Sequence, residues 1–285
     1  PNTWRDTEEQ LILHTDFKKP QDMSGKAWVL LVAGSKDWDN YRHQANVCCA
    51  YQLMKKQGIP DEQIVVMIYD DIANNPNNPF PGSIRSVVDQ TNVYKSVPLD
   101  YTGNKVKSKN FLAVLRGDDS AGGKIIRSKK NDNILIYMSG VGSDANFKFP
   151  QDSLDAHQFT TTINTMSDDK KYSKMVIFMD SDNSQSVFKG LFTNIHVYGV
   201  ASCDSANQNR SVQNDPDRGI YLSDQFSAAW LTFISTADLE KATFSKLFEY
   251  IKNKDDSCPC EIGDKEIPKL LISNFLKLEG CSDCA

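Results

Sequence analysis

Five short segments of the chain are almost continuously apolar and rich in valine and isoleucine. They are residues 26–35, 63–69, 133–139, 175–180 and 195–202. Strands of a parallel sheet have this composition when helices cover both faces, because neither face of the sheet then meets water. The pattern therefore predicts a mostly parallel central sheet.

Helical patterns alternate with these predicted strands. Between the first two strands, residues recur at helical spacing at Tyr41, Ala45, Cys48, Cys49 and Leu53. Gly58 and Pro60 then supply a helix stop. Amphipathic stretches at about residues 224–233, 238–252 and 267–278 predict further covering helices. The expected architecture is a three-layer α/β/α sandwich.

Residues 70–132 interrupt this alternation. Residues 74–82 read NNPNNPFPG, and residues 92–103 contain another proline and glycine with little periodicity, so we expect this region on the surface. A helix-like stretch at residues 111–115 then ends at Arg116, Gly117 and Asp118. This tripeptide is a candidate integrin-binding motif if it is displayed at the tip of a loop.

Composition and charge narrow the class of protein. With 285 residues, 40% of them apolar, the chain forms one large domain or one domain with an extension. The net charge is -5 and basic residues are scattered, which argues against nucleic acid as a partner. No apolar run approaches the ~20 residues of a membrane span. The first ten residues, PNTWRDTEEQ, lack a signal pattern, so we expect any signal peptide to have been removed.

The seven cysteines form two groups. Cys48, Cys49 and Cys203 lie in or beside apolar segments and are interpreted as buried thiols. The other four cluster near the carboxyl end: Cys258, Cys260, Cys281 and Cys284. This even local number predicts either two disulfides or a four-thiolate metal site. The Cys-Pro-Cys spacing is poor for zinc, so disulfides and a secreted or endolysosomal setting are favoured. A glycosylation sequon at Asn209 is compatible with that setting.

Two of the predicted strands stop abruptly in small and polar residues, within residues 133–143 and 174–186. In an open α/β sheet, the carboxyl ends of the strands line the ligand crevice. Chemistry is therefore expected at these two ends. The side chains that they offer include Val141 and Asp182.

Several motifs, in order from residue 28 to residue 230, resemble the legumains, the asparaginyl endopeptidases of the caspase-like clan. They are WVLLVAGS, NYRHQA, GIPDEQIVVMIYDDIA, VPLDYTG, NFLAVLRGD, KMVIF and YLSDQFSAAW. The resemblance implies a caspase-like sheet and cleavage after Asn or Asp. It places the legumain-like domain at residues 26–254, after an amino-terminal arm at residues 1–25. Residues 255–285 are then a Cys-containing extension packed on the same domain.

The resemblance also implies that the catalytic dyad is missing. Val141, next to Gly140, stands where the family has its general-base histidine, and Asp182 stands where it has its nucleophilic cysteine. Asp180 replaces a family glutamate. Valine transfers no proton, and a carboxylate is a weak nucleophile toward an amide whose charge opposes an oxyanion.

No replacement for the dyad is evident elsewhere in the sequence. The histidines are His14, His43, His157 and His196, and none follows the third predicted strand. Three further side chains are possible nucleophiles in the abstract but are interpreted as turn hydroxyls and a buried thiol: Ser181, Ser184 and Cys203.

The residues of the substrate pocket are better preserved than the dyad. Arg42, His43 and Asp224 fall on family positions that hold the substrate's Asn side chain. An arginine beside an aspartate offers donors and acceptors to both ends of a carboxamide. The alternative is a buried salt bridge that anchors the first helix. The pocket wall, residues 203–212, differs from that of the family.

The expected function is therefore that of an inactive homologue that binds a protein or peptide, such as a cystatin-type inhibitor or a receptor, without cofactor or metal. The alternative is residual or changed activity, either cysteine-type cleavage after Asn or metal-dependent chemistry. The hypothesis of metal-dependent chemistry rests on the Asp-x-Asp sequence at Asp180 and Asp182. This sequence resembles the first residues of the catalytic motif of some magnesium-dependent phosphotransferases.

Overall fold

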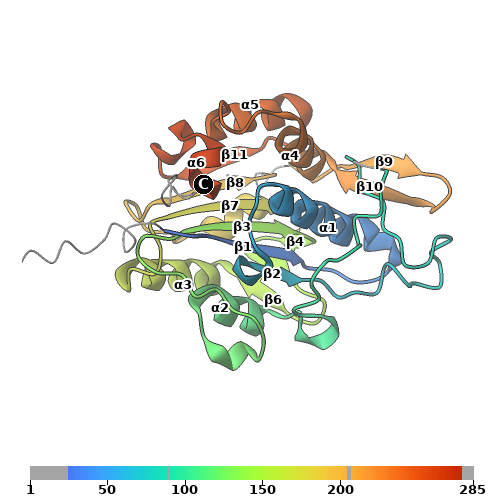
Figure 1. The fold of residues 1–285 in the computed structure, drawn as a ribbon, viewed down its shortest axis with the longest axis horizontal. Coiled ribbons are helices and arrows are strands. Elements are labelled where there is room, and N and C mark those ends of the chain that lie inside the picture. Colours follow the sequence, from blue (N-terminus) through green and yellow to red (C-terminus); the bar gives the residue numbers. More distant parts are fainter. Residues whose placement is uncertain (1–24, 89, 204–206, 278–285) are drawn as a thin grey trace, which may run out of the picture.

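The computed structural model describes residues 25–88, 90–203 and 207–277. Its central sheet has the strand order β11-β8-β7-β3-β1-β2 (Figure 1). The strands are β1 (Ala27–Ala33), β2 (Ile64–Met67), β3 (Asn133–Ser139), β7 (Lys174–Asp180), β8 (Val197–Ala201) and β11 (Cys260–Gly263). All neighbours are parallel except β11, which runs antiparallel to β8. The predicted parallel sheet is confirmed.

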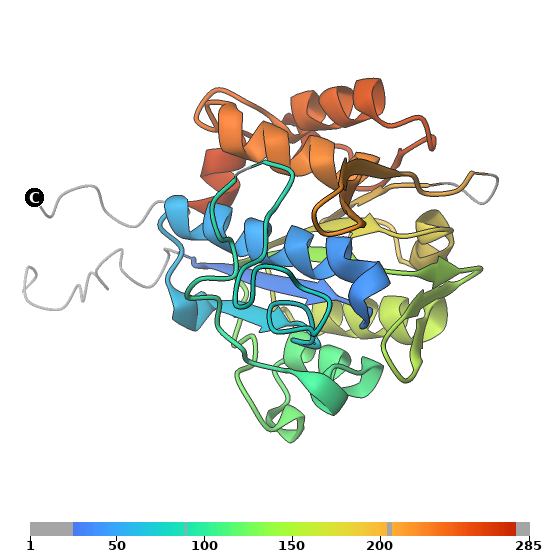
Figure 2. The same cartoon turned by 90° about the vertical axis from the view of Figure 1, so that its right-hand side faces the viewer.

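Helices cover both faces of the sheet, which explains why β1 and β3 are buried along their whole length. On one face lie α1 (Tyr41–Lys56), α4 (Gln225–Thr236), α5 (Phe244–Lys254) and α6 (Ile272–Leu276), and on the other α2 (Ser108–Arg116) and α3 (Ala156–Asp168) (Figures 1 and 2). Each face has its own apolar core. Tyr137 of β3 stacks on Trp230 of α4 with ring centroids 4.5 Å apart. The three-layer sandwich is therefore observed as predicted.

Two smaller sheets flank the main one. After β3, the strands β4 (Gly142–Ser143), β5 (Asn146–Lys148) and β6 (Ser153–Asp155) form an antiparallel sheet, and β9 (Ser211–Asp215) pairs with β10 (Ile220–Asp224) as a hairpin. Short 3₁₀ helices are η2 (Trp38–Asn40), η3 (Asp61–Gln63), η4 (Gly103–Lys105), η5 (Asp119–Ala121), η6 (Ser184–Phe188) and η7 (Ile267–Lys269). The hairpin β9–β10 delivers Asp224 to the amino end of α4.

The carboxyl-terminal part differs from expectation. The single helix predicted at residues 267–278 is wrong, because the chain becomes extended at Leu270 and Leu271 between η7 and α6. The helix expected from residue 238 begins only at Phe244, where the Thr243 side chain accepts a hydrogen bond from the backbone N–H of Lys246. Residues 260–263 are the edge strand β11, so the predicted extension completes the main sheet.

The turn-rich segment after β2 runs over the α1 side of the sheet, but it is anchored there. Its aliphatic side chains Ile72, Ile84, Val93 and Val97 are buried against the core of that side. The surface position predicted for this segment therefore needs the correction that it also closes part of the core.

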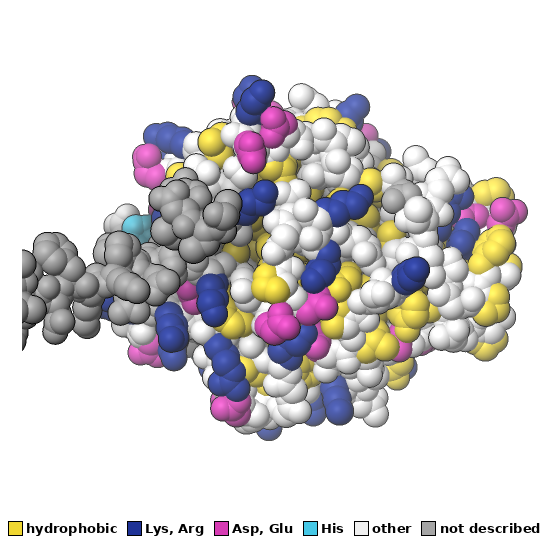
Figure 3. Space-filling model, viewed as in Figure 1, with side chains coloured by type: hydrophobic (Ala, Val, Ile, Leu, Met, Phe, Trp, Pro, Cys, Tyr) yellow, Lys and Arg dark blue, Asp and Glu magenta, His cyan; other side chains and the backbone are white. Residues whose placement is uncertain are grey.

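The surface carries both signs of charge. On the face shown in Figure 3, Lys and Arg side chains are scattered, with Asp and Glu between them. Within the described ranges, no helix has the length and apolar character needed to cross a membrane. The predicted arm, apart from residue 25, lies outside the described residues, as do Cys281 and Cys284.

Candidate functional site

The two strand-end turns lie side by side at the carboxyl edge of the sheet. Strands β3 and β7 pair in register, with Ser139 opposite Asp180, and Gly140 N donates to Asp180 O at 3.0 Å. A Cβ on Gly142 would lie 2.0 Å from the carbonyl oxygen of Asp182, so only glycine fits at this approach. The structure therefore brings together the turns that carry Val141 and Asp182.

Neither turn presents a dyad of a base and a thiol. Val141 is half-buried, and its carbonyl oxygen accepts the backbone N–H of Lys148 at 2.9 Å. The Asp182 Oδ1 atom accepts the backbone N–H of Asn209 at 2.6 Å. Asp182 therefore binds residues 207–212, the described part of the pocket wall and here called the wall segment, and is not an unengaged carboxylate.

Asp180 is fully buried beneath these turns. Its Oδ1 atom accepts the side-chain amide of Asn209 at 2.5 Å, and its Oδ2 atom accepts the backbone N–H of Ser227 at 3.2 Å and the Ser227 hydroxyl. Burial, and after it the nearby Asp224 carboxylate, raise the pKa of Asp180 to about 8. The carboxyl group is therefore mostly protonated at neutral pH.

Arg42, His43 and Asp224 meet between the start of α1 and the end of β10. Arg42 Nε donates to Asp224 Oδ1 at 2.9 Å, and the Ser211 hydroxyl donates to the same oxygen at 3.3 Å. His43 Nε2 lies 3.8 Å from Asp224 Oδ2, and both of these buried atoms lack a hydrogen-bond partner. Burial, and then the Arg42 charge, lower the pKa of His43, so its imidazole is neutral.

Burial raises the pKa of Asp224, although Arg42 opposes the shift. The predicted arginine–aspartate pair is therefore present, and it also links α1 to β10 as the alternative interpretation proposed. Two neighbouring atoms have no hydrogen-bond partner. His43 Nε2 is a donor or an acceptor, depending on the tautomer, and Asp224 Oδ2 is an acceptor.

Sequence reasoning missed Ser35, which follows β1 at the same edge of the sheet. Its hydroxyl lies 2.6 Å from His43 Nδ1. The order Ser35, His43, Asp224 resembles a catalytic triad, but 3.8 Å between His43 and Asp224 is too long for a hydrogen bond, and Ser35 is only 6% exposed. We interpret Ser35 as a residue that orients the imidazole.

Sequence reasoning also missed the position of Asn209, which it singled out only as a sequon. Both its side-chain amide and its backbone N–H donate to carboxylates of the β7 turn. Its Oδ1 atom lies 3.9 Å from Cys203 Sγ, which donates to it. The predicted glycan would be attached to the same Nδ2 atom that donates to the buried Asp180, and glycosylation at this residue stays a prediction.

The other candidate nucleophiles are enclosed. Cys203 is buried, as predicted, and burial raises the pKa of its thiol to about 12. Ser184 is buried and its hydroxyl lies 3.2 Å from that of Ser202, while Ser181 Oγ is buried without a partner. None of the three has a described histidine as a hydrogen-bond partner.

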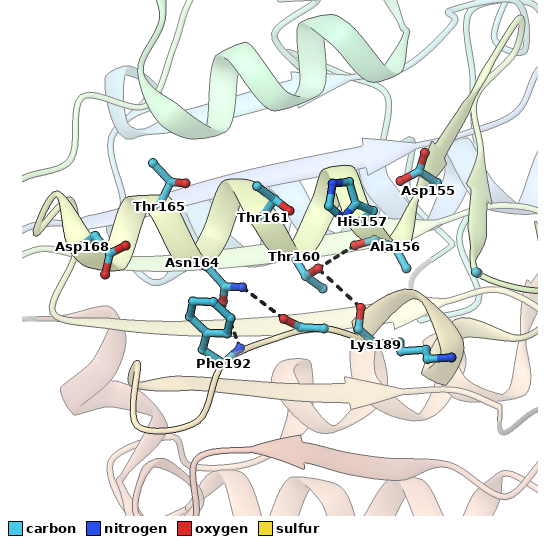
Figure 4. Close-up of a pocket in the computed structure, with 12 residues that line it drawn as sticks. Asp155, Ala156, His157, Thr160, Thr161, Asn164, Thr165, Asp168, Lys189 and Phe192 are labelled. Atoms are coloured by element: carbon cyan, nitrogen blue, oxygen red, sulfur yellow. Dashed lines mark hydrogen bonds between the residues drawn. The ribbon is translucent and has the colours of Figure 1, made fainter.

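The remaining described histidines lie elsewhere. His196 precedes β8 at the opposite end of the sheet, 3.8 Å from Asp264. His157 lies on α3 and lines a groove of about 800 Å³ together with Lys189 and Phe192 (Figure 4). Asn164 bonds to other residues that line this groove: its Nδ2 donates to Gly190 O at 3.0 Å and its Oδ1 accepts from Phe192 N at 2.9 Å. His14 lies outside the described residues.

The metal and disulfide hypotheses receive no support from the described residues. Among residues 25–88, 90–203 and 207–277, no group of three or more His, Cys, Asp or Glu side chains is placed to hold a metal ion. No disulfide is formed within these ranges, where Cys258 is exposed. Cys281 and Cys284 are not described, so the disulfides involving them stay a prediction.

The candidate adhesion motif lies at the carboxyl end of α2. Arg116 Nη2 donates to Asp118 Oδ2 at 2.9 Å, and Gly117 is the left-handed cap residue with φ 76°. The charged groups of the motif are therefore paired with each other on a compact turn instead of being displayed on an extended tip. Integrin binding stays a prediction.

Comparisons with known proteins show what the chain resembles in sequence and in fold. The profile of the peptidase C13 family matches residues 27–278. The chain is 39% identical to rat legumain over 269 residues, with 92% of this chain and 62% of the relative covered. It is 40% identical to human legumain, with 90% of this chain and 60% of the relative covered. With the delta isozyme of vacuolar-processing enzyme from Arabidopsis thaliana the identity is 35%, over 94% of this chain and 62% of the relative.

The chain thus spans about 60% of the length of the human relative. Among solved structures, caspase-1 from Spodoptera frugiperda superposes with a TM-score of 0.50 at 9% identity, covering 85% of this chain and 87% of the other. This likeness shows a caspase-like fold.

Proposed function

The chain belongs to the peptidase C13 family, and from that premise we propose that it is a legumain-like pseudopeptidase that binds a protein or peptide without cleaving it. The observation that carries the proposal is the pair of adjacent turns after β3 and β7. They meet at the edge where a dyad would have to act, and they carry Val141 and Asp182.

The chemistry of these residues supports loss of the protease mechanism. Valine cannot accept the proton of a thiol or protonate a leaving amine. Asp182 is occupied by the Asn209 backbone, and its charge would oppose a developing oxyanion. Removal of a key triad residue in a model protease costs on the order of a millionfold in rate. The raised pKa of the Cys203 thiol and its burial argue against a substitute.

The pocket supports a binding function. Arg42 retains donors beyond the one that it gives to Asp224, and the unpaired atoms of His43 and Asp224 lie 3.8 Å apart in a buried setting. Buried polar atoms without partners are costly, so a ligand that supplies both a donor and an acceptor gains affinity there. A carboxamide is such a group.

The partner we propose is therefore a protein or peptide that presents an Asn side chain from an exposed segment. A cystatin-type inhibitor of active legumains fits this description, and the protein would then act as a decoy. A secreted or endolysosomal compartment fits the name of the vacuolar-processing relative. A role as an adhesion ligand, with the fold as a rigid platform, would instead depend on residues outside the pocket.

Binding of a labelled Asn-containing peptide or inhibitor to the wild type, Arg42→Ala and Asp224→Asn tests the proposal. Loss of one hydrogen bond to a charged group predicts a weakening of about tenfold or more in either variant. His157→Ala, in the separate groove on α3, is the matched control and should bind as the wild type does. Equal affinity in all four proteins would refute binding at this pocket.

A further inference from the structure

The wall segment places an asparagine side chain of the chain itself against the pocket floor. Asn209 Nδ2 donates to Asp180 Oδ1 at 2.5 Å, and its Oδ1 accepts from Cys203 Sγ at 3.9 Å. Its backbone N–H donates to Asp182 at 2.6 Å. Both ends of the carboxamide and the backbone amide of one residue are therefore held by the site.

We infer that Asn209 is an intramolecular occupant that closes the pocket and that a ligand Asn must displace it. The inference rests on the proposed function, because it concerns the same site. It adds a closed resting state, in which the protein's own carboxamide takes the hydrogen-bond positions that a partner's carboxamide needs.

Competition follows from the geometry of Asp180. This carboxyl group is fully buried, and its Oδ2 atom is already taken by the backbone N–H and hydroxyl of Ser227. Its Oδ1 atom faces the wall segment and accepts the hydrogen bond of Asn209. A ligand amide that donates to Asp180 must therefore take the place of Asn209.

The neighbouring atoms show that this closure leaves the pocket incomplete. Two residues after Asn209, the Ser211 hydroxyl donates to Asp224 Oδ1, so the same wall segment reaches both carboxyl groups of the floor. Yet Asp224 Oδ2 and His43 Nε2, on side chains that are at least 98% buried, have no partner. Asn209 satisfies Asp180 without satisfying this second pair.

The wall segment is held mainly by polar contacts rather than by apolar packing. Gln208 and Arg210 on either side of Asn209 are exposed, and residues 209, 211 and 212 are half-buried. Arg210 contributes its carbonyl oxygen to Gln225 N at 2.8 Å and an ion pair to the exposed Asp256 at 3.8 Å. Displacement of the segment therefore exposes little apolar surface, as a movable closure requires.

Peptide affinity in variants of the wall tests the inference. Unglycosylated wild type, Asn209→Ala and Asn209→Ser are titrated with a fluorescent Ala-Ala-Asn peptide, with Gln208→Ala as the matched control. If the open state makes up about 1 to 10% of the wild type, removal of Asn209 tightens binding by about 10- to 100-fold. Gln208→Ala should leave the affinity unchanged. Equal affinity of folded Asn209 variants and wild type overturns the closure.

A second measurement separates failure of the closure from failure of the proposed function. Hydrogen exchange of the Asn209 side-chain amide, followed by NMR in the wild type without ligand, is slow if the amide is held by Asp180. Slow exchange with no peptide binding in any variant supports closure and refutes peptide binding. Fast exchange, together with peptide binding that depends on Arg42, refutes closure and keeps the proposed function.

Discussion

Replacement of Asp180 by Asn should remove a specific part of the protein's dependence on pH. Asp180 is fully buried, and its pKa is raised from 3.8 to about 8 by burial and then by Asp224. The folded state therefore binds this proton more tightly than the unfolded state. The stability that comes with this proton is fully present below pH 3.8 and is lost as pH rises toward about 8.

The magnitude follows from the same shift. Between pH 5 and pH 7 the folded state holds the proton and the unfolded state does not. The free energy of unfolding therefore falls by about 1.4 kcal/mol per pH unit, or about 2.7 kcal/mol in total. Asn is neutral at both pH values and can keep the contacts if the Asn209 amide turns over, since it can both donate and accept. The free energy of unfolding of Asp180→Asn should therefore fall by about 2.7 kcal/mol less than that of the wild type between these pH values.

Urea unfolding followed by tryptophan fluorescence at pH 5 and pH 7 measures this difference. Asp169→Asn, at an exposed carboxylate after α3, is the matched control and should follow the wild type. Other carboxyl groups with raised pKa, such as Asp224 and Asp255, are present in all three proteins. Asp180 is mostly neutral between pH 5 and pH 7, so its replacement by the neutral Asn leaves their electrostatic surroundings nearly unchanged in this interval. An unfolding free energy that falls equally with pH in Asp180→Asn and the wild type would refute the reasoning.

Three further predictions concern the turns and the buried thiol. Gly142→Ala should lower the unfolding free energy by about 3 kcal/mol, because its Cβ would lie 2.0 Å from the Asp182 carbonyl oxygen; wild-type urea stability would contradict this. The Cys203 thiol, with a pKa of about 12, should react with iodoacetamide at least about 100-fold more slowly than the exposed Cys258 at pH 8, as read by peptide mass spectrometry, and equal rates would count against its burial. The double replacement Val141→His with Asp182→Cys should raise cleavage of an Asn peptide by at least about 100-fold over the wild type, and a single replacement that matched it would refute the assignment of the pair.

The layered fold was predictable because its signals are local. Continuous Val- and Ile-rich segments are buried on both sides, and the helical spacing after β1 produced α1 as expected. The carboxyl-terminal elements were less accessible to this reasoning. The edge strand β11 is short and only partly buried, and its residues form no continuous apolar segment. Its position in the sheet depends on pairing with β8, which lies far from it in the sequence.

The positions of site residues were predictable only where these residues directly follow a strand of the main sheet. Register between β3 and β7 brings the two turns together, which parallel topology implies. The positions of Ser35 and Asn209 depend on loop paths between strands, and no spacing in the sequence encodes them. Asn209 lies 29 residues from its partner Asp180, on a segment that has no periodic pattern.

The central claim is most directly tested by turnover of an Ala-Ala-Asn fluorogenic peptide at acidic and neutral pH, with an active legumain and Arg42→Ala measured beside the wild type. We predict no cleavage above background by the wild type at either pH, while the active legumain cleaves the peptide under the same conditions. Cleavage by the wild type that disappears in Arg42→Ala would contradict the account, because it would require a nucleophile other than the missing dyad.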